Sequence, residues 1–254
     1  MYILGFETTG PLGSAAIIEI ETGEVKTLLI NEPMSHLKNV ASLGERLLQE
    51  EISTGKVRDN LAAVSASIGP GSFTGIRIGV TLARSIGQAL EIPLISAPTL
   101  ELFRERCTSK DSSVAVILNA RRGQVYGGVF AYSENQVKDL LTPGPYMLTD
   151  VLTITDEHPG TIFYGDGIDY YDEELKEREK NKTLVYAGED IRYQSADMVV
   201  RLALEKYKRG EILNSPLELL PDYMRLSEAE QKLKDGTLQK LREEKMARFI
   251  KHNS

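Results

Sequence analysis

Hydrophobic positions in the first part of the chain alternate between strand-like and helix-like spacing. Three β-rich runs separated by short turns come first, and this arrangement predicts an antiparallel meander. Apolar residues then recur at helical spacing after Ser35, a candidate N-cap, so we expect a helix over 35–50. A buried strand at 61–68 runs into a glycine-rich loop and a second helix. Strand 92–96 and a helix over 99–106 follow.

The remainder of the chain repeats this mixture of strands and helices. A β-rich block begins at residue 114, and a short helix, two further strands and a helix terminated by Gly210 come after it. Because the succession starts again near residue 108, the sequence predicts two α/β halves. We assign residues 1–107 to the first half, 108–213 to the second half and 214–254 to a C-terminal segment.

The stretch 68–87, IGPGSFTGIRIGVTLARSIG, is a glycine-rich loop that opens a helix, a setting that often binds phosphate. Its spacing matches none of three well-known loops. A Walker A loop needs a lysine after its last glycine, but Ile76 follows Gly75. The dinucleotide fingerprint needs a glycine where Thr74 stands, and a nucleophile elbow centred on Ser72 lacks both flanking glycines. The loop is therefore expected to be a turn followed by a helix, not a catalytic phosphate loop.

Small residues recur every four positions along that helix. Gly75, Gly79, Ala83 and Gly87 form a stripe that is almost free of side chains. A glycine inside a helix costs about 1 kcal/mol relative to alanine, so the stripe requires a close contact to explain it. Two interpretations are open. The stripe packs on the chain's own sheet, or it forms a protein–protein surface that the preceding helix, with Gly44, extends.

Composition and charge reduce the number of functional classes to which this chain can belong. Hydrophobic residues make up 41% and charged residues 26% of the 254 positions, as in ordinary soluble proteins. The formal charge of −7 disfavours a free-standing nucleic-acid binder, which needs a basic face. Glu7 interrupts the first apolar run, so no signal peptide is expected, and no run is long enough to cross a membrane. With a single cysteine, Cys107, the pattern predicts a cytoplasmic protein.

Catalytic and metal-binding patterns are missing from the sequence. Its three histidines are His36, His158 and His252, and none has a second histidine four residues later, as a zinc-binding helix needs. No nucleophile–base pair stands out either. The sequence therefore predicts no catalytic residue and no metal ligand.

Five motifs together resemble the TsaB family of bacterial proteins, which is required to make threonylcarbamoyladenosine next to the tRNA anticodon. In order along the chain they are ILGFETT, GPGSFTGIRIGVTLARSIG, LNARRGQVYGGVF, YGDG and LPDYMRLSEAE, and they span residues 3–230. The resemblance implies the actin-like ATPase superfold (ribonuclease H-like), in which two related α/β halves face each other across a cleft.

The resemblance also implies where a nucleotide would lie. In active members of the superfold, an acidic residue in each half helps to hold the metal and the phosphates. Here the first position carries Glu7, where aspartate is the usual family residue, and the second carries Asn119, a weaker ligand for a hard cation. The residues of a weak nucleotide cleft would be Glu7, Thr8, Thr9, Asn119, Gly165 and Gly167. We expect no tightly bound cofactor, and ATP only in complex with partners.

Partners follow from the same resemblance. TsaB is the non-catalytic relative of TsaD, the transferase that moves the threonylcarbamoyl group onto tRNA, and pairs with it through helices of its first half. TsaE, an ATPase, joins the assembly, and TsaB alone forms homodimers through the same kind of surface. On this chain the interface would comprise His36, Val40, Gly44, Gly75, Arg77, Gly79, Ala83 and Gly87. Contact with tRNA would be indirect, and no contact with membranes is expected.

The resemblance thus implies a non-catalytic partner and activator of TsaD. One alternative is an independent ATPase or peptidase of the actin-like superfold, as the family's older glycoprotease label suggests. Another is a homodimeric structural protein without a partner.

The C-terminal tail has a pattern of its own. Ser227 and Glu230 form a capping box that predicts a helix start. Residues 237–254 combine a loose apolar face with basic side chains. Two interpretations are open: the tail folds back on its own domain, or it reaches a partner chain or tRNA phosphates.

Overall fold

The computed structural model of the chain describes residues 1–224, apart from 31–35, 53–54, 109–111, 122 and 182. The side chains of residues 36–38 also fall outside this description. Residues 1–222 form one compact unit, and a second unit begins at Tyr223. The capping box and the tail 237–254 lie outside the described residues.

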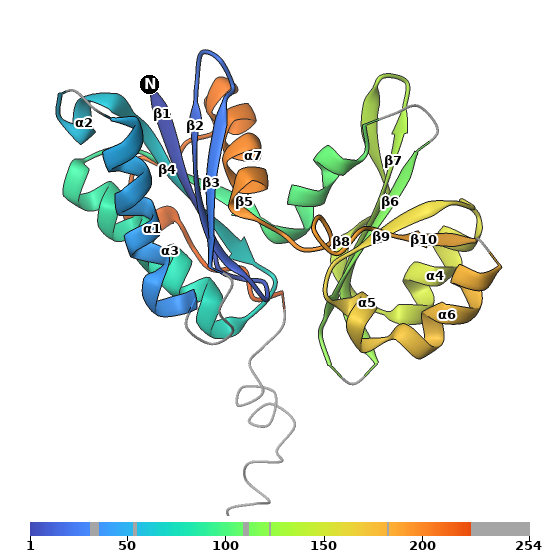
Figure 1. The fold of residues 1–254 in the computed structure, drawn as a ribbon. Helices are drawn as coiled ribbons and strands as arrows, with labels where there is room; N and C mark the ends of the chain where they lie inside the picture. The colour runs from blue at the N-terminus through green and yellow to red at the C-terminus, as the bar shows by residue number, and fades with distance from the viewer. Residues whose placement is uncertain (31–35, 53–54, 109–111, 122, 182, 225–254) are drawn as a thin grey trace, which may run out of the picture. The chain divides into compact units, whose positions relative to one another are not determined.

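The first sheet contains five strands in the order β3-β2-β1-β4-β5 (Figure 1). They are β1 (Tyr2–Glu7), β2 (Gly13–Glu19), β3 (Val25–Ile30), β4 (Leu61–Gly69) and β5 (Leu94–Pro98). Strand β2 pairs antiparallel with β1 and β3, which confirms the expected meander. Strand β4 runs parallel to both β1 and β5.

Helices cover both faces of the first sheet. They are α1 (His36–Glu51) and α3 (Phe73–Leu90) on one face and α7 (Ala196–Lys208) on the other, with the short α2 (Val57–Asn60) before β4 (Figure 1). Apolar side chains of α7, including Val200 and Ala203, form a core with Ile3, Ala63 and Ile95 of the sheet. Burial of this apolar surface is what holds the helix in place.

The second sheet repeats the plan of the first. Its strands are β6 (Ser113–Asn119), β7 (Gln124–Ser133), β8 (Gln136–Met147), β9 (Thr161–Tyr164) and β10 (Leu184–Tyr186), in the order β10-β9-β6-β7-β8. Strand β7 is antiparallel to β6 and β8, and β9 is parallel to β6 and β10. Because β6 holds the place that β1 holds in the first sheet, the expectation of two related α/β halves is confirmed.

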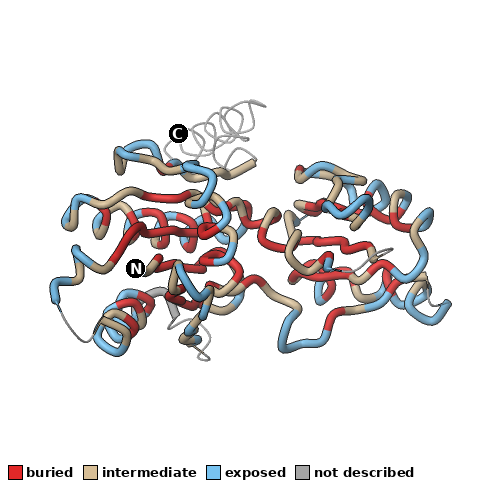
Figure 2. Tube along the Cα trace, turned by 90° about the horizontal axis from the view of Figure 1, so that it is seen from above, coloured by how far each residue is buried: buried red, intermediate tan, exposed pale blue. Residues whose placement is uncertain are grey.

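The second sheet has its own helices and core. The helices are α4 (Leu148–Asp156), α5 (Gly167–Tyr170) and α6 (Asp172–Lys180). Phe163 of β9 packs with Val151 of α4 and Leu175 of α6 in one buried cluster. Figure 2 shows long buried stretches in both halves and exposed residues on helix surfaces and loops. No described helix combines the length and the apolarity that crossing a bilayer requires.

The structure differs from the expected halves at α7. We assigned residues 108–213 to the second half, but α7 completes the core of the first sheet. Gly5 of β1 permits the contact, because a Cβ there would lie 2.5 Å from Val200 Cγ1. The order of elements in the sequence does not show that the chain returns to the first sheet after it has formed the second.

Two short 3₁₀ helices complete the described fold, η1 (Thr99–Arg106) and η2 (Pro216–Glu218). The first of them connects β5 to β6. Arg104 of η1 pairs with Asp139 of β8 at 2.7 Å, and the Phe103 ring lies 5.7 Å from that of Tyr164. The connection between the sheets is thus anchored on the second one.

A carboxyl group in η1 makes the stability of the fold pH-dependent. Burial raises the pKa of Glu105 to about 7; among nearby charges Arg106 opposes the rise and Asp197 of α7 adds to it. Folding therefore takes up a proton there. This contribution to stability is complete below the ordinary pKa of 4.5 and is lost as the pH rises to about 7.

We predict that Glu105→Gln, which stays neutral, raises the free energy of unfolding at about pH 8 by about 1–3 kcal/mol and removes this part of the pH dependence. Urea denaturation at about pH 5 and pH 8 measures both effects. Substitution of the exposed Glu189 by Gln serves as the control and should change neither. A variant that keeps the full wild-type slope would contradict the prediction.

Candidate functional site

Helix α3 begins at the glycine-rich loop that follows β4. Ser72 is its N-cap, since Ser72 Oγ accepts a hydrogen bond from Gly75 N at 3.2 Å. The loop before it turns through Gly69 and Gly71, whose φ angles of 113° and 153° suit glycine. The helix ends at Glu91, in the left-handed conformation with φ 53°. The expected turn followed by a helix is thus confirmed, and the structure adds Ser72 as the cap of that helix.

The small-residue stripe of α3 faces the interior of the chain. Its four members, Gly75, Gly79, Ala83 and Gly87, are all buried. A Cβ at Gly75 would overlap the carbonyl oxygen of Thr8, and one at Gly87 would lie 2.6 Å from Leu94 Cδ2. The first interpretation of the stripe is therefore supported, and the assignment of these four positions to a partner interface is wrong because the chain itself covers them.

Two α1 positions expected at the interface are also buried. Val40 is 1% exposed, and a Cβ at Gly44 would lie 2.8 Å from Phe6 Cε1. Their assignment to the interface is wrong for the same reason. The side chain of His36 lies outside the described residues. Among the expected interface residues that the structure describes, Arg77 alone is exposed.

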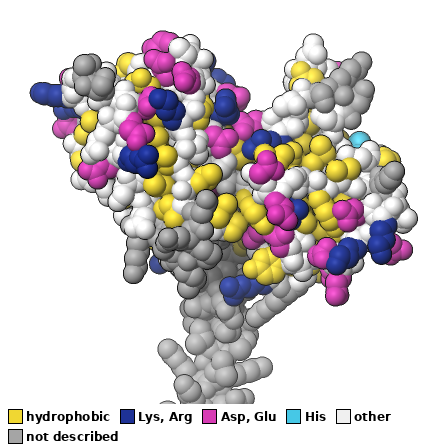
Figure 3. Space-filling model, viewed as in Figure 1, with side chains coloured by type: hydrophobic (Ala, Val, Ile, Leu, Met, Phe, Trp, Pro, Cys, Tyr) yellow, Lys and Arg dark blue, Asp and Glu magenta, His cyan; other side chains and the backbone are white. Residues whose placement is uncertain are grey.

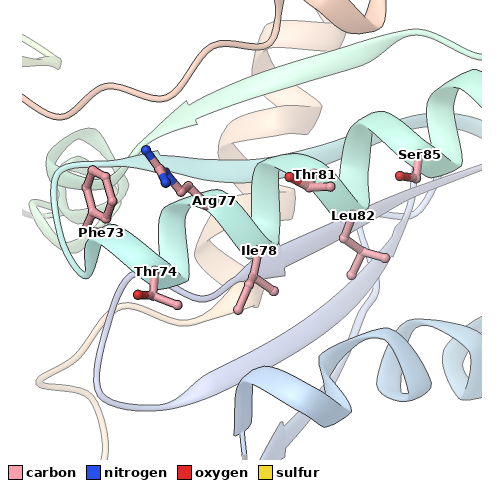
Figure 4. Close-up of a pocket in the computed structure, with 7 residues that line it drawn as sticks. All are labelled: Phe73, Thr74, Arg77, Ile78, Thr81, Leu82 and Ser85. Carbon is pink, nitrogen blue, oxygen red and sulfur yellow. The ribbon is translucent and has the colours of Figure 1, made fainter.

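The opposite face of α3 is open and partly apolar. It borders a hollow of about 530 Å³ (Figure 4). The residues that line this hollow, which together we call the outer face of α3, are Phe73, Thr74, Arg77, Ile78, Thr81, Leu82 and Ser85. Phe73 is 42% exposed, and the Arg77 guanidinium lies 4.0 Å from the centre of its ring. Figure 4 shows Thr74, Ile78 and Leu82 in a row along one edge of the helix.

Of the outer face, the sequence-based prediction included only Arg77, and it missed Ile78 and Leu82 because they look like core residues. The usable signal was the helical period itself. Once Gly75, Gly79 and Ala83 face inwards, the positions two residues further along, 77, 81 and 85, lie about 200° around the helix and must face outwards. In the space-filling view, hydrophobic side chains on this half of the molecule lie among acidic and basic ones (Figure 3).

The turn after β1, residues 7–10, encloses a carboxyl group. The Glu7 side chain is 0% exposed, and its Oε1 accepts hydrogen bonds from Thr9 N at 2.5 Å, Thr9 Oγ1 at 2.6 Å and Gly10 N at 3.1 Å. Its Oε2 is buried and has no hydrogen-bond partner in the described part of the chain. Burial raises the pKa of Glu7, and the hydrogen bonds oppose the rise. Glu7 thus binds its own turn, which we call the β1 turn.

The corresponding turn after β6 carries Asn119. Its Oδ1 accepts a hydrogen bond from the backbone N–H two residues on at 2.8 Å, and Asn119 N donates to Asp166 Oδ1 at 3.0 Å. Gly165 and Gly167 lie against β6, because a Cβ at either would come within 2.7 Å of Ile117 O. Burial also raises the pKa of Asp166.

Neither turn fits direct coordination of a divalent cation. Such a cation needs several accessible oxygen ligands, but Glu7 Oε1 already accepts three hydrogen bonds and Asn119 Oδ1 accepts a backbone N–H. Glu7 Oε2 has no hydrogen-bond partner among the described residues, but it is buried and is a single ligand. The N–H groups of Thr9 and Gly10, which could cradle a phosphate, donate to Glu7 instead. No cluster of three or more metal-binding side chains occurs in the described residues.

The expected nucleotide-site residues therefore form two local groups. Glu7, Thr8 and Thr9 meet in the β1 turn, where Thr8 and Thr9 are 1% and 3% exposed. Asn119, Gly165 and Gly167 meet beside β6. A joint nucleotide site made from both groups remains an expectation from the sequence.

Comparison with known proteins assigns the family. The model of the family TsaD, tRNA N6-adenosine threonylcarbamoyltransferase, matches residues 33–232. The TsaB protein of Bacillus subtilis is 29% identical over 174 residues, which are 68% of this chain and 73% of that protein. Escherichia coli TsaB is 28% identical over 107 residues, 41% of this chain and 45% of that protein.

Solved structures share the fold. A Pseudomonas aeruginosa protein with similarity to the peptidase YeaZ has a TM-score of 0.71 at 20% identity, covering 88% of this chain and 99% of that one. YeaZ from the same organism has a TM-score of 0.66 at 20% identity, covering 87% and 99%. The chain therefore belongs to the TsaD family of the matched model, and its curated relatives identify it as a TsaB-type member of that family.

Proposed function

We propose that this chain is a non-catalytic partner and activator of a TsaD transferase in forming threonylcarbamoyladenosine next to the tRNA anticodon. The observation that carries the proposal is the contrast between the turns after β1 and β6 and the outer face of α3. The turns after β1 and β6, which correspond to those that hold phosphate and metal in active relatives, form internal hydrogen bonds, whereas the outer face of α3 is open and partly apolar. A protein built in this way is suited to binding another chain rather than to chemistry.

The occupant of the outer face, in this proposal, is TsaD. Family membership and the TsaB relatives support that choice over an unrelated partner. The partner surface that fits is a helix with an apolar stripe to cover Ile78 and Leu82 and an acidic group to meet Arg77. Phe73 and Arg77 are exposed in the chain by itself, and an aromatic–arginine pair that a partner covers is typical of residues that dominate binding energy.

The same face serves in homodimers when TsaD is absent. Two copies of an open, partly apolar helix face bury it against each other, so the homodimer and the TsaD complex compete. TsaE joins after TsaD is bound, and tRNA reaches the chain only through the complex. The chain binds no cofactor tightly by itself, and ATP enters only with the partners.

The docking surface is tested by placing a charge on it. Ile78→Glu should weaken association with TsaD of the same organism roughly hundredfold, because the interface would bury an unpaired carboxylate. Titration calorimetry and the mass of the mixed complex measure this loss. The matched control is Val185→Glu, which introduces the same charge at an exposed apolar residue of β10. Normal binding by Ile78→Glu, or equal weakening by both variants, would refute the assignment of the surface.

A separate experiment tests the proposal that the chain by itself has no catalytic activity. The purified chain with Mg²⁺ and ATP should hydrolyse ATP no faster than buffer, and metal analysis should find no stoichiometric zinc or iron. Addition of TsaD and TsaE provides the active comparison. Sustained hydrolysis by the chain alone that disappears in Glu7→Gln would favour the alternative of an independent ATPase.

A further inference from the structure

The β1 turn lies directly on the small-residue stripe of α3. Thr8 Oγ1 donates a hydrogen bond to Gly75 O at 2.7 Å, and Ser72 N donates to Thr9 O at 2.8 Å. A Cβ at Gly79 would lie 2.5 Å from Thr8 Oγ1. The turn therefore touches both the first residue before the helix and its second turn.

The first two residues of the stripe lie closer to this turn than to the sheet. At Gly75 and Gly79 the atom nearest to an added methyl group would belong to Thr8, whereas Ala66 Cβ of β4 is 3.9 Å from the methyl position at Gly79. An alanine at residue 79 could tolerate the sheet at that distance. It could not tolerate the Thr8 hydroxyl without movement of the helix or the turn.

The β1 turn is itself firmly held. Glu7 accepts three hydrogen bonds from it, and Gln194 Nε2 donates to Thr9 Oγ1 at 3.3 Å from the segment before α7. Glu7, Thr8, Thr9 and Gln194 are each at most 3% exposed. Of the two groups in contact, α3 is therefore the one with freedom to adjust, since its outer face is open.

Because an α-helix moves as a unit, a contact on one side of it also determines the position of the side chains on its other side. Gly75 and Gly79 lie on the inner side, and Arg77 and Ile78 project from the other side of the same two turns. Distances between a helix and its support follow the side chains at the contact. The distance between Thr8 and α3 thus determines the position of the outer face of α3.

We propose that Thr8 is a positioning residue for partner docking: its hydroxyl, seated on Gly75 and Gly79, fixes the placement of the outer face of α3. This inference rests on the proposed function for the identity of the partner. It assigns a role in binding to a turn that lies on the inner side of α3, away from the outer face.

The test is a cycle of three variants: Gly79→Ala, Thr8→Ala and the double variant. Gly79→Ala alone adds a methyl group against the hydroxyl and should weaken TsaD binding about tenfold. Thr8→Ala removes Oγ1, after which the next atom, Thr8 Cβ, lies 3.7 Å from the new methyl, an ordinary contact distance. The double variant should therefore recover to within about threefold of the binding of Thr8→Ala.

Amide hydrogen exchange in α3 gives a second, partner-free measurement. Exchange in residues 73–79 should rise in Gly79→Ala and return toward the Thr8→Ala level in the double variant. The matched control is Gly127→Ala in the second sheet, where a Cβ would lie 3.0 Å from Val151 Cγ2. It should lower thermal stability without changing TsaD affinity and without being rescued by Thr8→Ala.

The outcomes separate the two proposals. Equal binding by wild type and Gly79→Ala, or failure of Thr8→Ala to rescue either measurement, overturns the positioning role while the docking function stands. If wild type does not bind TsaD, the proposed function fails, and the exchange cycle alone decides whether Thr8 positions α3. If Gly79→Ala does not fold, Thr8→Val replaces it: loss of the hydroxyl should speed exchange about fivefold, and Thr8→Ser should restore it.

Discussion

The close approach of the β1 turn to α3 is the constraint on which the first half depends. Thr8 O occupies the place that a side chain at position 75 would need, so glycine is required there. The turn can approach so closely because Glu7 satisfies the N–H groups of Thr9 and Gly10 from within. Without that carboxyl, the buried N–H of Thr9 and the part-buried N–H of Gly10 would lose their acceptor. One acidic side chain and a row of glycines therefore form a single structural unit.

The second half uses the same topology and a different solution at the same place. Asp166 accepts the N–H of Asn119 from a neighbouring turn, whereas Glu7 caps its own turn. Both arrangements direct side-chain oxygens inwards, towards backbone donors. In both halves, the residues of these turns thus take part in internal hydrogen bonding.

Much of the fold could be predicted from the sequence because its signals are local. The meander, the capped helix after Ser72 and the restart of the α/β pattern all follow from hydrophobic period and turn residues. The candidate site was predicted less well. Glycine spacing shows that something lies close to α3, but it cannot show whether that neighbour is Thr8 or another protein. Likewise, Ile78 and Leu82 look like core residues until the inner face is known, and the buried state of Glu7 depends on contacts made far away in the sequence.

The packing of α7 on the first sheet has a consequence for synthesis of the chain. The sheet needs Val200 and Ala203 to cover one of its faces, although its own last strand, β5, ends at Pro98. About a hundred residues therefore separate the completion of that sheet from the arrival of its cover. During synthesis, this face of the sheet therefore has no cover until α7 has been made. The second half, whose strands and helices are contiguous in sequence, can form its own core before α7 completes that of the first half.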